Sequence, residues 1–175
     1  PCSILTDSNE EKGIQMAIKN LQKDIAQVSG NRPEILNISN GDRQTIIIGS
    51  NESPFIKALF KTGKLEKEEL NGKKEKYIIR TIDKPLEGID RALVIAGSDK
   101  REQIGVSPWY WWADVPVVKQ KNVYVIPGSY TDGEPAVTYR GIFLNDEAPC
   151  LTGWVKQTYG TNYGDHRFYA RIFEL

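Results

Sequence analysis

The sequence predicts an α/β layer structure, in which β-strands pack against two or three flanking helices. One observation is a stripe of apolar side chains at helical spacing within residues 7–30. A second is a series of short β-branched runs, of which residues 91–98 are apolar on both faces, as in a central strand. The third is length, because 175 residues suffice for one domain, or one domain plus a fragment, with a core that needs no cross-links.

The first elements are a short strand at residues 2–6 and the amphipathic helix that follows it. The apolar positions of this helix recur at intervals of three, four and seven residues, which indicates a surface helix lying on a sheet. Ser8 with Glu11 three residues later predicts a capping box, and Gly30 predicts the end of the helix.

A second, short helix is expected after Ser53, because Ser53 is a good cap and Pro54 suits the first helical position. Residues 64–76 are highly charged and are expected to form a surface loop or a fraying helix. Residues 162–175 carry an apolar stripe that predicts a helix. The remaining strands are expected at residues 34–38, 45–49, 76–82, 91–98, 122–128 and 136–146.

The composition narrows the classes of function. Lysine plus arginine equals aspartate plus glutamate, 23 each, and this balance argues against a nucleic-acid binder. His166 is the only histidine, so we expect no histidine-rich metal site, and no motif calls for a cofactor. Cys2 and Cys150 are either two indifferent thiols or one bridge. No apolar run reaches about 18 residues, so no membrane span is expected.

An aromatic run, GVSPWYWWADVP, contains three of the four tryptophans of the chain. On a strand, Trp109 and Trp111 face one side and Trp112 faces the other. Either both sides are buried between layers, or one side is a platform for a ligand with a flat apolar face, such as a sugar or a nucleobase. Asp114 is placed to add a polar contact. The neutral net charge favours the sugar.

Polar residues arrive abruptly at the end of the apolar strand at 136–146, where Asn145, Asp146 and Glu147 follow one another. Sites form at this end of parallel strands, although Asn and Asp are also ordinary turn formers. Glycoside hydrolysis needs two carboxyl groups about 5–9.5 Å apart. Adjacent residues on a strand point to opposite faces, so at most one of Asp146 and Glu147 serves. The catalytic pair is not identified by the sequence.

Four stretches, taken together, resemble the N-terminal region of glycoside hydrolase family 115, the xylan α-1,2-glucuronidases. They are ILTDSNEEKGIQMAIKNLQKDI, DRALVIAGSDKR, EQIGVSPWYWWADVPV and GSYTDGEPAVTYRGIFLNDEAPCLTGW. They occur in the family's order and cover nearly the whole chain. SPWYWWADVP and YRGIFLNDEAP are long enough to be specific.

This resemblance implies a mixed β-sheet flanked by helices over residues 1–135, followed in residues 136–175 by the first strand and helix of a truncated (β/α)8 barrel. It implies an exported enzyme, extracellular or periplasmic after removal of a signal peptide, that releases glucuronic acid or its 4-O-methyl form with inversion. The implied partners are glucuronoxylan or xylo-oligosaccharide and the rest of the barrel. Asn145, Asp146 and Glu147 would line the pocket, and the aromatic run would lie against the barrel mouth.

The sequence departs from the family in two places. It stops at Leu175, so we expect this piece to be inactive alone. It also lacks about ten residues between Arg101 and Glu102, where the connection between strands is too short for a parallel crossover, which needs a dozen or more. We expect the natural chain to continue there. The alternative function is a stand-alone carbohydrate-binding module that uses Trp109–Trp112 as its platform.

Overall fold

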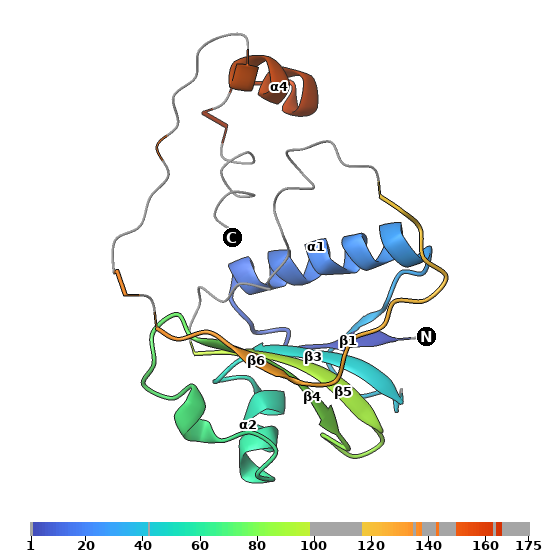
Figure 1. Cartoon of the computed structure of the whole chain (residues 1–175), viewed down its shortest axis with the longest axis vertical. Helices are drawn as coiled ribbons and strands as arrows, with labels where there is room; N and C mark the ends of the chain where they lie inside the picture. Colours follow the sequence, from blue (N-terminus) through green and yellow to red (C-terminus); the bar gives the residue numbers. More distant parts are fainter. Residues whose placement is uncertain are drawn as a thin grey trace. The chain divides into compact units, whose positions relative to one another are not determined.

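The computed structural model contains a six-stranded mixed β-sheet (Figure 1), in the order β2-β1-β3-β5-β4-β6. Strands β1, β2, β3 and β5 run parallel to one another, whereas β4 is antiparallel to both β5 and β6. The mixed sheet with flanking helices confirms the predicted fold class. The strands are β1 (Ser3–Leu5), β2 (Ile35–Leu36), β3 (Gln44–Ser50), β4 (Tyr77–Asp83), β5 (Arg91–Gly97) and β6 (Ser129–Thr131).

The structure describes residues 2–41, 43–98, 117–134, 136–137, 143, 150–162 and 164–165. The chain divides into two compact units, each of which is described by itself. The first comprises residues 1–104 with 116–135, and the second comprises residues 105–115 with 136–175.

The sheet carries one helix on each face. Helix α1 (Lys12–Ser29) covers one face and helix α2 (Pro54–Lys61) covers the other (Figure 1). Successive residues of a strand point to opposite faces, and β3 follows this rule. Ile48 packs with α1 residues in one core cluster, whereas Ile47 packs with α2 residues in the other. The central strands are therefore buried on both sides, as their continuous apolar runs predict.

The ends of the helices agree only in part with the prediction. Gly30 ends α1 in a left-handed conformation, with φ 75°, and its N–H donates to the carbonyl oxygen of Ala26 at 2.9 Å. The predicted capping box of Ser8 and Glu11 is wrong, because α1 begins only at Lys12, with Glu11 at the N-cap. Residue Asp7 instead accepts a hydrogen bond from the N–H of Asn9, a side-chain turn that delays the helix.

Two other predictions need correction. The strand predicted at 122–128 is wrong, because the chain there is irregular and β6 begins only at Ser129. Pro127 has no N–H to donate to a ladder, and pairing with β4 starts just after it. The charged segment 64–76 is also more than a surface loop. It forms a short 3₁₀ helix, η1 (Lys67–Glu69), and buries Leu65 and Leu70 almost completely in the core.

The described part of the second unit contains helix α4 (Cys150–Tyr159), which the sequence analysis did not predict. Its buried residue is Val155, and the rings of Trp154 and Tyr159 pack edge to face with centroids 5.9 Å apart. Cys150 and Cys2 do not form a disulfide bridge. The helix predicted at 162–175 lies almost wholly outside the described residues. None of the described helices has the length and apolar character needed to cross a membrane.

Replacing Gly49 by alanine tests the contact between β3 and α2. A Cβ atom at Gly49 would lie 2.7 Å from the Cβ of Ser53, an atom fixed by the α2 backbone. We expect Gly49→Ala to lower the free energy of unfolding by about 1–3 kcal/mol, measured by urea denaturation. Gly13→Ala in α1 is the matched control, because its Cβ would meet nothing within 4 Å. It should be neutral or stabilising by up to about 1 kcal/mol. Equal stability of the two variants would refute the contact.

Candidate functional site

All residues that the sequence analysis selected for sugar binding lie outside the described part of the chain, and so does the Arg101–Glu102 junction. They stay predictions. These residues are Trp109, Trp111, Trp112, Asp114, Asn145, Asp146 and Glu147.

Among the described residues, polar side chains gather where the parallel strands end. Thr6 follows β1, Ser50 ends β3, and Ser98 follows β5. Helices α1 and α2 leave β1 and β3 toward opposite faces of the sheet (Figure 1). From β1 the sheet continues with β2 on one side, and from β3 it continues with β5 on the other. Open α/β sheets usually bind ligands at the ends of two such adjacent strands.

Glu10 is the central acidic residue of this edge. Its side chain is buried, and its Oε1 accepts hydrogen bonds from the backbone N–H of Ser50 at 2.8 Å and from the Ser50 hydroxyl at 3.2 Å. The loop that carries Glu10 is held in turn by Gln15, whose Nε2 donates to the Glu10 carbonyl oxygen at 2.7 Å. These bonds join the start of α1 to the end of β3. Sequence reasoning missed Glu10, although an acidic residue soon after a first strand was the available signal.

Two buried hydroxyl groups accompany Glu10. Neither Thr6 Oγ1 nor Ser53 Oγ has a hydrogen-bond partner within the described residues. Ser53 Oγ and Glu10 Oε1 both approach the space beside Gly49, 2.8 and 3.0 Å from where a Cβ would stand. Glycine is therefore required there by close approach rather than by its backbone angles. The described chain has no group of three or more His, Cys, Asp and Glu residues placed to hold a metal ion.

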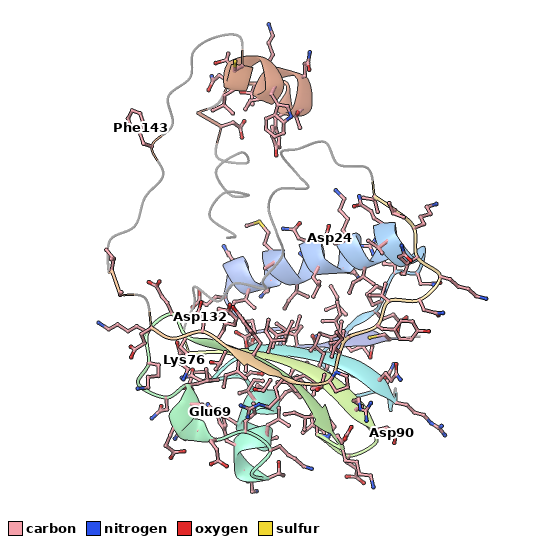
Figure 2. All side chains as sticks on the ribbon, viewed as in Figure 1. Asp24, Glu69, Lys76, Asp90, Asp132 and Phe143 are labelled. Atoms are coloured by element: carbon pink, nitrogen blue, oxygen red, sulfur yellow. The ribbon has the colours of Figure 1, made fainter. Side chains whose placement is uncertain are left out.

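A second polar cluster joins η1 to the sheet edge. The guanidinium of Arg80 donates from Nη2 to Glu69 Oε1 at 2.7 Å and from Nη1 to Glu69 Oε2 at 3.0 Å, and its Nε donates to Ser129 Oγ at 2.8 Å. Figure 2 labels Glu69, which lies on the α2 side of the sheet. The hydrogen bonds from Arg80 hold the pKa of the Glu69 carboxyl below its usual range. Such a two-pronged pair fixes geometry as well as charge.

Tyr77 and Tyr130 form an aromatic pair between β4 and β6. Their ring centroids lie 5.9 Å apart at an interplanar angle of 38°. Burial, assisted by a hydrogen bond with Tyr130, raises the pKa of Tyr77 to about 12. Tyr77 thus contributes an aromatic face and a hydroxyl group to the pairing of β4 with β6.

Two described residues that precede and follow the aromatic run in the sequence, Ser98 and Gln120, are hydrogen-bonded within the first unit. Ser98 donates its N–H to the Lys76 carbonyl oxygen at 2.8 Å, and Ser98 Oγ accepts from the Lys76 N–H at 2.9 Å. Figure 2 labels Lys76 beside the sheet. Gln120 donates its N–H to the carbonyl oxygen of Val28, in the last turn of α1, at 2.8 Å.

Comparison with known proteins finds a family model and solved structures that match this chain. The model of glycosyl hydrolase family 115 matches residues 132–175. The solved structure of a family GH115 4-O-methyl-α-glucuronidase with specificity for decorated arabinogalactans is similar to the whole chain. The TM-score is 0.73 and the sequence identity is 26%, over 99% of this chain and 23% of that chain. This chain thus spans less than a quarter of that relative. No curated protein sequence matches it. Together the matches confirm the resemblance that the motifs predict.

Replacing Glu69 by glutamine tests the cluster with Arg80. A carboxyl with a lowered pKa stabilises the fold above its unfolded pKa, near 4.5, and loses this contribution as the pH falls through its folded pKa. We expect Glu69→Gln to cost about 1–2 kcal/mol at pH 7, because a charge-assisted pair is lost from a site about a quarter exposed. Chemical denaturation from pH 7 to pH 3 should show this deficit shrinking below pH 4.5.

Asp83→Asn is the matched control, because it breaks the Asp83–Arg91 pair, whose side chains are 71% and 55% exposed. We expect a smaller loss of stability from this variant. A Glu69→Gln deficit that stays constant down to pH 3 would contradict the assignment.

Proposed function

Because this chain corresponds to the N-terminal region of glycoside hydrolase family 115, we propose that it is part of an enzyme that removes glucuronic acid, or its 4-O-methyl form, from polysaccharide side chains. The observation that carries this proposal is the similarity of the whole chain to a family 115 glucuronidase. Glucuronoxylan is the substrate we propose, as the sequence motifs suggest. Decorated arabinogalactan, the specificity described for the relative, is the competing substrate.

The proposed chemistry is hydrolysis with inversion. One carboxylic acid protonates the oxygen of the departing sugar, while a carboxylate on the opposite face activates water. Asp146 or Glu147 helps to hold the sugar or the water, and an arginine binds the uronate, because its planar fork matches a carboxylate. Such an enzyme acts outside the cytoplasm, extracellularly or in the periplasm, where its polysaccharide substrate is found.

The first unit has a supporting part in this proposal. It holds Ser98 and Gln120, which precede and follow the segment that carries Trp109–Trp112, by backbone hydrogen bonds. Held flanking residues lower the entropy that an aromatic platform loses when it binds a sugar. The same hydrogen bonds also serve the alternative function, a carbohydrate-binding module, so the two proposals have to be separated by measurement.

Uronic acid release by the intact protein tests the proposal. We expect release from glucuronoxylan, with kcat/KM reduced by about 30- to 1,000-fold in one of the two variants Asp146→Asn and Glu147→Gln, since only one of these carboxylates holds the sugar or the water. Asp83→Asn is the control and should retain full activity, because Asp83 lies on the exposed end of β4. Measuring uronic acid release from decorated arabinogalactan in the same way shows which polysaccharide is the substrate.

The 175-residue chain should release nothing by itself, since one strand end offers one wall of a sugar pocket. Release by this chain alone would overturn the proposed division of the site. If no form releases uronic acid, but this chain binds xylan fragments tightly and loses binding on Trp111→Ala, the protein is a binding module instead.

A further inference from the structure

A hollow lies between the start of α2 and the 3₁₀ helix η1, on the face of the sheet that α2 covers. Its volume is about 250 Å³. Pockets for drug-sized ligands measure roughly 300–1,000 Å³, so this hollow suits one sugar ring rather than a chain of them. Its lining consists of Asn51, Glu52, Lys57, Phe60, Lys67 and Asn71.

The charges of this lining leave one positive charge unbalanced. Lys57 Nζ donates to Glu52 Oε2 at 2.7 Å, and this hydrogen bond is the largest cause of the lowered pKa of Glu52. Lys67 also lowers the pKa of Glu52, but only through its more distant charge. Lys67 has no ion-pair partner in the described part of the chain. Two lysines against one glutamate thus favour a ligand with a single negative charge.

The uncharged lining residues supply hydrogen bonds and an apolar face. The backbone of Asn51 is fixed by its N–H bond to the Gly97 carbonyl oxygen at 2.9 Å, and that of Asn71 by its bond to the Lys67 carbonyl oxygen at 2.8 Å. Their side-chain amides have no partners among the described residues. Phe60 is half-buried and packs against the core, so its ring is held in place.

We propose that this hollow binds a single carboxylate-bearing sugar residue. Lys67 binds the carboxylate, Asn51 and Asn71 bind hydroxyl groups, and the ring of Phe60 packs against the C–H face of the sugar. Inorganic phosphate uses the charge but leaves the aromatic ring and most of the amide donors without a role. The inference rests on the proposed function and adds to it a second site for the same acidic sugar, formed by residues of the α/β unit and separate from the arginine that binds the uronate during hydrolysis.

The test is an NMR titration of the isotope-labelled 175-residue chain with glucuronate, glucose and inorganic phosphate. We expect glucuronate to shift the backbone amides of Asn51 and Asn71, with a dissociation constant on the order of 1 mM. Glucose should bind at least about fivefold more weakly, because it lacks the charge that Lys67 recognises. Phosphate should also bind more weakly than glucuronate.

Two variants and one control separate the contributions. Lys67→Gln should weaken glucuronate about five- to tenfold and leave glucose unchanged, while Phe60→Leu should weaken both sugars. Lys19→Gln, an exposed lysine on α1 at the other face of the sheet, should change neither. Unfolding midpoints check that Phe60→Leu is still folded, and Lys67→Gln carries the test if it is not.

Three results would overturn the inference: no shift at Asn51 or Asn71, equal binding of glucuronate and glucose, or an equal effect of Lys19→Gln and Lys67→Gln. The proposed function is judged separately by uronic acid release from the intact protein. If the intact protein releases uronic acid but the hollow does not bind glucuronate, only the inference is refuted. If the hollow binds glucuronate but the intact protein releases no uronic acid, only the proposed activity is refuted.

Discussion

The close packing of both helices onto the short parallel strands is the constraint on which the structure depends. Strand β3 lies between β1 and β5 and sends Ile48 toward α1 and Ile47 toward α2. At its end, Gly49 leaves room for Ser53 of the α2 cap and for the carboxylate of Glu10, which precedes α1. One strand thus fixes two helical layers and the loops that begin them. A bulkier residue at this point would disturb both layers together.

This arrangement explains why polar residues collect on one side of the first unit. Parallel strands end at one edge, and the loops after β1, β3 and β5 all leave from it. Glu10 and Ser50 bond across that edge, and the segment that bears the aromatic run departs from Ser98 beside them. The hollow lined by Asn51 begins at this edge, because Asn51 and Glu52 follow β3, and the rest of its lining comes from α2, η1 and the turn after η1. Binding groups therefore gather where the backbone is already held by the sheet.

Patterns that rest on neighbouring residues predicted the fold well. Short apolar runs rich in β-branched residues predicted β1 to β5, and Gly30 and Pro54 marked helix boundaries correctly. Where a distant partner decides the outcome, the sequence was insufficient. Leu65 was misjudged for this reason, because its burial depends on core residues that are distant in the sequence. The start of α1 was misjudged for a local reason, because Asp7 forms a turn with Asn9 that competes with the predicted capping box. Glu10 could not be recognised as a bridge, since its partner Ser50 is 40 residues away.

Net charge, which is also read from the sequence, is likewise insufficient to predict function. A total of zero excludes a broad basic surface, such as nucleic-acid binders use, but says nothing about a single lysine. Glu52 pairs with Lys57 and so leaves Lys67 to set the sign of the charge around them. A neutral polysaccharide with occasional uronic acid branches presents isolated single charges, not a dense anionic surface. One lysine without an ion-pair partner, next to amide side chains and an aromatic ring, matches such a branch. A strongly basic protein would bind many anions and would not distinguish a uronic acid branch from the others.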